Sequence, residues 1–127
     1  MDEPVKPKKI LVVDDEKETL DFLSNTLKRV GFEVLSTTRG EEAVKLAKER
    51  KPDLIVLDIL IPDMSGGKVA DILYEDPATY KIPVIFVTGI IHKRNEGIVK
   101  KSGTHYIIAK PVSPQELIDS VNAIISK

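Results

Sequence analysis

The chain has 127 residues and 42% of them are hydrophobic, which is enough for one domain whose core needs no structural metal. It contains no cysteine, which excludes disulfide bonds, thiolate-bound zinc and a cysteine nucleophile and suits a reducing compartment. Nineteen basic residues nearly balance 20 acidic residues without a long run of either sign, so we expect no direct nucleic-acid binding. No apolar run approaches the roughly 20 residues of a membrane span, so we expect a cytoplasmic protein without membrane association.

Five short apolar runs are predicted to be strands. In chain order they are Ile10–Val13, Glu33–Thr37, Leu54–Leu57, Val84–Val87 and Tyr106–Ile108. The first, third and fourth runs consist almost wholly of β-branched residues and leucine, without polar alternation. This composition is typical of strands that are covered on both faces, as in a parallel sheet.

Amphipathic stretches between and after these runs predict helices. Apolar residues recur at helical spacing at Leu20, Leu23, Leu27 and Val30, at Ala43, Leu46 and Ala47, at Val69, Ile72 and Leu73, and at Leu117, Ile118, Val121, Ile124 and Ile125. Gly31 is expected to end the first helix, and Ser65 to cap the third. The last helix begins at Ser113–Glu116, where a serine cap, a proline and a glutamate suited to a capping box follow one another. Asn95–Lys101 includes Gly97 and few apolar residues, so we expect only a short or mobile helix there.

Five β/α units predict a doubly wound α/β fold, in which a five-stranded parallel sheet carries five helices on its two faces. Residues 1–8, which include two prolines, are expected to form a flexible leader, and residues 9–127 a single domain. The chain ends about where the fifth helix should close, so we expect no output domain. Whether the chain is a stand-alone protein or a fragment of a longer regulator is left open.

Polar residues suited to phosphoryl chemistry follow four of the predicted strands, at Asp14, Asp15, Asp58, Thr88 and Lys110. The carboxyl ends of parallel strands meet at one edge of the sheet, where ligands bind in this class of fold. Three carboxylates at one place repel each other unless a hard divalent cation such as Mg²⁺ lies among them. A carboxylate is also a possible nucleophile toward phosphorus, and a cation and a hydroxyl group compensate the charge of the transferred group. Gly89, directly after the threonine, places no side chain where a phosphoryl group would arrive.

Each of these residues also has an ordinary structural explanation. Asp14 and Asp15 are suited to cap a helix, Asp58 to begin a turn, and the Lys110–Pro111 pair to end a strand. A short motif of this kind has a high false-positive risk when it stands alone. The joint occurrence of all of them at one edge of the predicted sheet favours a functional site.

Four segments in this order and spacing resemble the receiver domain of two-component response regulators, a CheY-like family. They are ILVVDDE at residues 10–16, DLIVLDILIPDMSG at 53–66, VIFVTG at 84–89 and IIAKP at 107–111, and the resemblance extends from Lys9 to Ile125. It implies a flavodoxin-like fold with strand order 2-1-3-4-5. It also implies a domain that accepts a phosphoryl group from a histidine kinase or histidine phosphotransfer protein and then changes conformation to signal to a partner.

The resemblance assigns a role to each residue of the acidic group. Asp58 would be the phosphoacceptor, and Asp15 and Asp58 would bind Mg²⁺ directly. Asp14 would hold metal-bound water, and the backbone carbonyl of Leu60 would complete the protein ligands. The protein would be a switch that gains and loses its own phosphoryl group, without turnover as an enzyme, and would be a monomer or a weak dimer.

The resemblance also assigns the cationic side of the site. Thr88 and Lys110 would contact the phosphoryl oxygens, and Pro111 would follow a cis peptide bond. The family usually has Tyr or Phe three residues before the lysine as a rotameric switch, but this chain has Ile107. Tyr106 precedes it and, because strand neighbours face opposite sides, should not replace the missing aromatic. Signal transmission should therefore differ from the family's usual route.

Three other classes of protein fit this pattern of polar residues less well. A haloacid-dehalogenase-like phosphatase would carry its nucleophile in a DxD motif after the first strand, where this chain has adjacent aspartates followed by Glu16. A flavin or nucleotide binder would need a phosphate-cradling loop after that strand, where Asp-Asp-Glu repels phosphate. A receiver-like interaction module that is never phosphorylated would not need all five polar residues.

Overall fold

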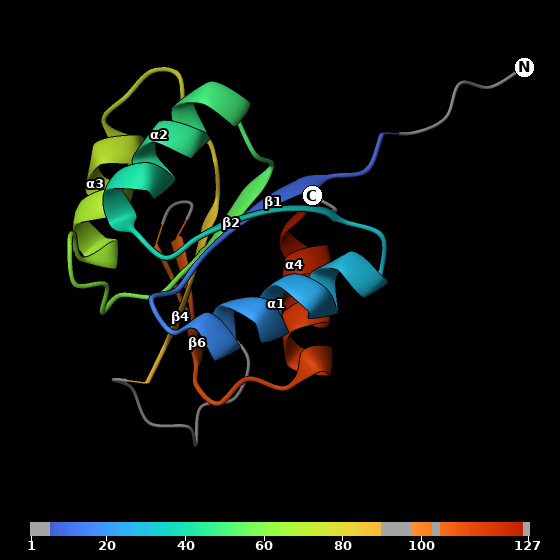
Figure 1. The fold of residues 1–127 in the computed structure, drawn as a ribbon. Helices are drawn as coiled ribbons and strands as arrows, with labels where there is room; N and C mark the ends of the chain where they lie inside the picture. Colours follow the sequence, from blue (N-terminus) through green and yellow to red (C-terminus); the bar gives the residue numbers. More distant parts are fainter. Residues whose placement is uncertain (1–5, 90–97, 103–104, 126–127) are drawn as a thin grey trace, which may run out of the picture.

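The computed structural model describes residues 6–89, 98–102 and 105–125 (Figure 1). One sheet with strand order β2-β1-β3-β4-β6-β5 lies between two layers of helices. The strands are β1 (Lys9–Val13), β2 (Glu33–Thr37), β3 (Leu54–Leu57), β4 (Val84–Thr88), β5 (Ile98–Ser102) and β6 (His105–Ala109). The helices are α1 (Lys17–Arg29), α2 (Gly40–Arg50), α3 (Gly66–Tyr74) and α4 (Pro114–Ile125).

The predicted parallel sheet is confirmed. The five expected strands are β1, β2, β3, β4 and β6, and every adjacent pair among them runs parallel. Counted without β5, their order is the expected 2-1-3-4-5. Every residue of β3 and β4 is buried, in agreement with the unbroken apolar composition of these two strands.

Helix starts follow the predicted capping signals. The Ser65 side chain accepts a hydrogen bond from the Lys68 backbone N–H at 3.2 Å and so caps α3. At α4, the Glu116 N–H donates to the Ser113 hydroxyl oxygen at 3.1 Å, and the Ser113 N–H donates to the Glu116 carboxylate at 3.0 Å. This reciprocal pair is the predicted capping box.

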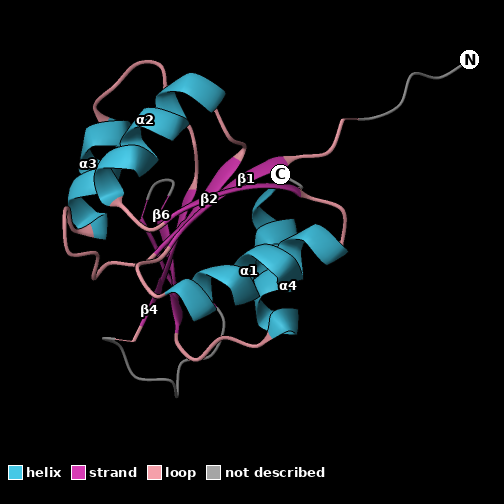
Figure 2. Cartoon of the chain, in the orientation of Figure 1, coloured by secondary structure: helices cyan, strands magenta, loops and turns pink. Residues whose placement is uncertain are grey.

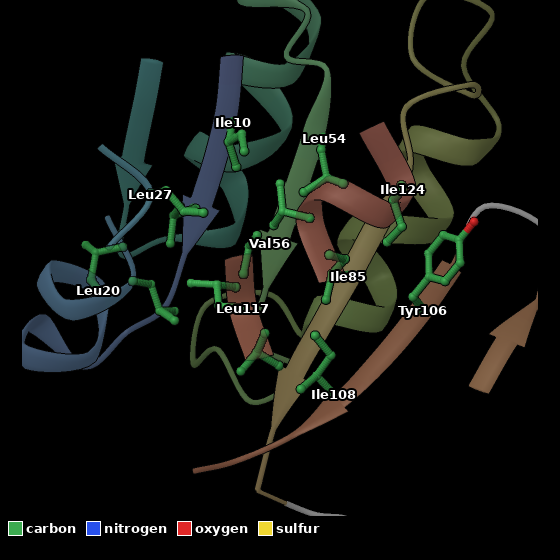
Figure 3. Packing of buried hydrophobic residues seen from close by; sticks show 14 residues of the cluster. Ile10, Leu20, Leu27, Leu54, Val56, Ile85, Tyr106, Ile108, Leu117 and Ile124 are labelled. Atoms are coloured by element: carbon green, nitrogen blue, oxygen red, sulfur yellow. The ribbon is translucent and has the colours of Figure 1, made fainter. Parts of the chain in front are cut away.

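Helices cover both faces of the sheet (Figure 2), and each face has its own apolar core. Helices α1 and α4 cover one face, where Leu27 and Leu117 belong to the same cluster as strand residues such as Ile85 (Figure 3). Helices α2 and α3 cover the other face. Tyr106 is buried in the core under α1 and α4, whereas the half-buried Ile107 packs against the core under α2 and α3. The expectation that these neighbours face opposite sides is confirmed.

The helix expected over Asn95–Lys101 is the one wrong prediction about the described elements. Residues 95–97 lie outside the described part, and Ile98–Ser102 forms β5, which pairs antiparallel with β6. The described residues therefore contain four helices and six strands, where we expected five of each. Two consecutive β-branched residues, Ile98 and Val99, have a low helix propensity, and the edge of β6 offers unpaired backbone groups to a strand.

The described helices include none that is long and apolar enough to cross a membrane. Residues 6–8 are exposed and have no regular secondary structure, although the Lys8 carbonyl accepts a hydrogen bond from the Glu33 N–H at 2.9 Å. The rest of the expected leader lies outside the described residues, so the domain boundary at residue 9 stays a prediction.

Candidate functional site

Three carboxylates meet at the carboxyl ends of β1 and β3. Each of Asp14, Asp15 and Asp58 offers an oxygen, and these atoms all lie within 4.8 Å of one another. The strand register explains the proximity, because Val13 is paired with Leu57 and the Asp58 N–H donates to the Val13 carbonyl at 3.0 Å. Asp14 and Asp58 are buried, whereas Asp15 is exposed. A compact set of oxygen donors open to solvent on one side suits a hard divalent cation such as Mg²⁺.

Lys110 connects the far strand β6 to this cluster. Its Nζ atom donates to Asp14 Oδ2 at 2.9 Å and to Asp58 Oδ2 at 3.2 Å. The pairing of Thr88 with Ala109 brings the lysine to the same edge, and the Lys110 N–H donates to the Thr88 carbonyl at 2.9 Å. The peptide bond from Lys110 to Pro111 is cis, as the resemblance implies.

Burial and the neighbouring hydrogen bonds and charges shift the pKa values of Asp14 and Lys110 in opposite directions. Burial raises the pKa of Asp14, and it outweighs the hydrogen bonds from Lys110 and the Glu16 N–H that would lower it. Burial alone would lower the pKa of Lys110, but hydrogen bonds and charge from Asp14 and Asp58 raise it. The lysine therefore stays protonated and offsets part of the negative charge of the buried carboxylates.

The loop after Asp58 is held tightly against the acceptor. The Leu60 N–H donates to Asp58 Oδ1 at 3.2 Å, and the Gly66 N–H donates to the Ile59 carbonyl at 2.8 Å. A Cβ atom on Gly66 would lie 2.2 Å from the Asp58 carbonyl oxygen, so only glycine fits without displacing the backbone. Leu60, whose carbonyl is the expected fourth protein ligand, follows two residues after the acceptor and is 61% exposed.

Thr88 is fully buried at the end of β4, between the strands that carry Asp58 and Lys110. Gly89 is exposed, and a Cβ atom there would meet no atom within 4 Å. An alanine would therefore also fit at this position, and the expectation that Gly89 leaves room for a phosphoryl group stays a prediction. Ile90, Ile91 and His92, the next residues in the sequence, lie outside the described residues.

Asp63 was not among the predicted site residues. Its carboxylate accepts from the Gly40 N–H at 2.8 Å and from the Glu41 N–H at 3.0 Å, at the start of α2. The sequence contains an indirect signal for this contact, since the residue at the N-cap of α2 is Arg39, which has no acceptor in its side chain. A helix start without a local cap indicates a partner from elsewhere in the chain.

Comparison with known proteins agrees with this geometry. The response regulator receiver domain model matches residues 10–122. The polar-differentiation response regulator DivK of Brucella anthropi is 33% identical over 119 residues, which cover 94% of this chain and 97% of DivK. The transcriptional regulatory protein PhoP of Bacillus subtilis, which is named for alkaline phosphatase synthesis, is 36% identical over 120 residues, but these cover only 49% of PhoP.

Solved structures give the same result. A crystal structure assigned to a response regulator of Chloroflexus aurantiacus superposes with a TM-score of 0.83 at 27% identity, and covers 96% of this chain and 100% of that chain. The receiver domain of the Francisella response regulator 1452 superposes with a TM-score of 0.80 at 29% identity, and covers 94% and 97%. The sequence matches and the shared fold point to the same family, and the acidic cluster is consistent with it. The chain belongs to the receiver domain family of two-component response regulators.

Proposed function

We propose that Asp58 accepts a phosphoryl group in a Mg²⁺-dependent reaction, from a histidine kinase or a histidine phosphotransfer protein. The observation that carries this proposal is the position of Asp58. It lies within 4.8 Å of two further carboxylates, and the Lys110 ammonium bonds to its Oδ2 atom. Asp14 has the same neighbours but is 0% exposed, against 6% for Asp58, and by the similarity to receiver domains the phosphoacceptor is the residue directly after the third strand, which here is Asp58.

The proposed step is a displacement at phosphorus. A carboxylate oxygen of Asp58 forms a bond to phosphorus while the phosphorus–nitrogen bond of the donor phosphohistidine breaks, and the imidazole nitrogen keeps the electron pair and takes up a proton. The product is an acyl phosphate on Asp58. We infer that the acyl phosphate persists until water cleaves it, so the domain acts as a switch and not as a turnover enzyme.

Different residues of the chain would bind the metal and contact the phosphoryl oxygens. Asp14, Asp15 and Asp58, with the Leu60 carbonyl, would hold Mg²⁺, which supplies charge compensation for the crowded carboxylates and phosphoryl oxygens. Lys110 lies between two carboxylates in the resting site and would transfer a hydrogen bond to a phosphoryl oxygen once Asp58 is esterified. The Thr88 hydroxyl would donate to a second phosphoryl oxygen.

We also propose where the phosphoryl donor docks. An open groove of about 470 Å³ lies beside the site, between α1 and the segment after β6, and its walls include Thr19, Phe22, Pro111 and Val112. Phe22 exposes 40% of its surface there, which is unusual for an aromatic side chain on a helix that otherwise buries its apolar face. An apolar groove that borders Lys110 suits a helix of the donor protein, because a donor must bring its phosphohistidine to the adjacent Asp58. Cytoplasmic location and a monomer or weak dimer stay predictions.

Acetyl phosphate tests the chemistry without the donor protein. Incubation with Mg²⁺ should add one phosphoryl group, detected by intact mass spectrometry, and the product should be absent in Asp58→Asn and after chelation of the metal. Labelling that persists in Asp58→Asn would refute the assignment of the acceptor. Absence of labelling in the wild-type chain, with Mg²⁺ binding intact, would favour the interaction module that is never phosphorylated.

A further inference from the structure

Helix α2 begins with a cap that comes from another element. Asp63 lies in the loop between β3 and α3, and each of its carboxylate oxygens accepts one backbone N–H of the first turn of α2, from Gly40 at 2.8 Å and from Glu41 at 3.0 Å. The first N–H groups of a helix have no partner within the helix, so this side chain stabilises a start that Arg39 cannot cap. The hydrogen bonds from Glu41 and Gly40 lower the pKa of Asp63, which keeps the carboxylate ionised.

The first turn of α2 also packs closely against the loop between β3 and α3. A Cβ atom on Gly40 would lie 2.6 Å from the Met64 carbonyl oxygen and 3.1 Å from a methyl group of Val69. Both neighbours belong to the segment that begins at the acceptor strand and continues into α3. A displacement of this loop therefore cannot leave the start of α2 unchanged.

The same loop is bonded to the acceptor itself. The Leu60 N–H donates to Asp58 Oδ1 at 3.2 Å, three residues before Asp63. Formation of the acyl phosphate replaces a carboxylate by a phosphoryl-bearing carboxyl group and so changes the acceptor of this hydrogen bond. The loop thus has a direct physical reason to shift when Asp58 reacts, and Asp63 is attached to it.

A second connection reaches the first turn of α2 from the other side of the site. The Asp14 N–H donates to the Thr37 carbonyl at 3.3 Å, at the end of β2. The Thr37 hydroxyl group donates to the Glu42 carboxylate and accepts from the Arg39 N–H, which lies 3.2 Å from its oxygen. Residues 37–42 are therefore linked to both of the strands that carry the acidic cluster.

We propose that Asp63 is a positioning residue that couples the acceptor loop to the first turn of α2, so that this turn responds when Asp58 is phosphorylated. The inference rests on the proposed function, because the perturbation that it transmits begins at Asp58. It assigns a readout to α2, on the sheet face opposite the groove proposed for the phosphoryl donor. It requires no aromatic switch and so is compatible with Ile107.

Two variants separate coupling from stability. Asp63→Ala removes both hydrogen bonds to α2. Ser65→Ala removes a cap of the same kind from the same loop, but this cap is local to α3, where Ser65 accepts from Lys68 at 3.2 Å. Both variants should lower thermal stability, and only Asp63→Ala should change communication with α2. Asp63→Asn, which keeps one carbonyl-type acceptor, should give an intermediate result and provides a second variant should Asp63→Ala fail to fold.

Amide NMR spectra with Mg²⁺ and beryllofluoride, a mimic of the acyl phosphate, measure the coupling. In the wild-type chain we expect the amide signals of Gly40 and Glu41 to shift together with those of Thr88 and Lys110. In Asp63→Ala the response at Gly40 and Glu41 should fall at least threefold while the response at Thr88 and Lys110 persists, and Ser65→Ala should behave like the wild type.

The possible results distinguish the two proposals. No response at Thr88 and Lys110 in the wild-type chain at saturating beryllofluoride would overturn the proposed phosphorylation site. A response there without one at Gly40 and Glu41 would overturn the coupling alone. An undiminished response of the two α2 amides in Asp63→Ala, or an equal loss in Ser65→Ala, would show that Asp63 acts only as a structural cap.

Discussion

Two adjacent glycines at the start of α3 should respond to alanine substitution with opposite signs. A Cβ atom on Gly66 would lie 2.2 Å from the Asp58 carbonyl oxygen and 2.8 Å from the Ile59 Cα atom, and both of these are backbone atoms that cannot rotate away. A Cβ atom on Gly67 would meet nothing closer than the Ser65 hydroxyl oxygen at 4.0 Å. Gly66→Ala therefore forces the acceptor loop to move, whereas Gly67→Ala only adds a good helix former to α3.

General magnitudes for overpacking and for glycine replacement give the expected size of each effect on stability. Forced overpacking typically costs about 1–3 kcal/mol, and replacing a glycine by alanine within a helix contributes about 0.5–1 kcal/mol. A chain of 127 residues has an unfolding entropy of about 0.27 kcal/mol per kelvin at its melting temperature, from about 2.1 cal/mol/K per residue. Gly66→Ala should thus lower the melting temperature by about 4–11 °C, and Gly67→Ala should raise it by about 2–4 °C.

Differential scanning calorimetry and the rate of labelling by acetyl phosphate measure both consequences. At a temperature well below either transition, Gly66→Ala should slow phosphorylation by roughly tenfold or more, because it displaces the backbone of the acceptor. Gly67→Ala should keep the wild-type rate within about twofold, since it touches no atom of the site. If the two variants changed stability in the same direction, or if Gly66→Ala kept the wild-type rate, the geometric argument would be refuted.

Three other outcomes follow from the site and its supports. Asp15→Asn should weaken Mg²⁺ binding more than Asp14→Asn, measured by calorimetric titration; both lose one negative charge, so equal losses would argue against separate ligand roles. Thr79→Val should cost about 1–2 kcal/mol in urea unfolding, because the buried Thr79 hydroxyl donates to the Leu73 carbonyl at 2.7 Å, and an unchanged midpoint would contradict this. The pKa of Asp63 lies below its ordinary value of 3.8, so its stabilising contribution is present above that pH and is lost as the pH falls through the lower value of the folded state. Acid unfolding of Asp63→Asn should therefore depend less on pH below about 4 than that of the wild type, and parallel curves would contradict the assignment.

Local patterns in the sequence determine the five parallel strands, the four described helices and the caps of α3 and α4. The five apolar runs predict β1, β2, β3, β4 and β6, and the unbroken apolar composition of β1, β3 and β4 follows from their being covered on both faces of the sheet. The capping box at Ser113 and the cap at Ser65 join residues only three positions apart, so sequence spacing alone identifies both. The clustering of Asp14, Asp15 and Asp58 could be predicted for a related reason, since they lie just after the ends of β1 and β3 and parallel strands end at one edge.

Contacts between distant segments were decided only by the tertiary structure. Asp63 caps a helix 22 and 23 residues earlier, and Lys110 bonds to Asp14 across 96 positions, which no local pattern specifies. Gly66 and Gly67 are alike in sequence and differ only in what lies beside them once β3 and α3 are packed. The segment Ile98–Ser102 became a strand and not the expected helix because the free edge of β6 supplies backbone partners. In each case the deciding partner is brought close by the crossover connections of the sheet, and propensity and periodicity report only on neighbours within a few residues along the chain.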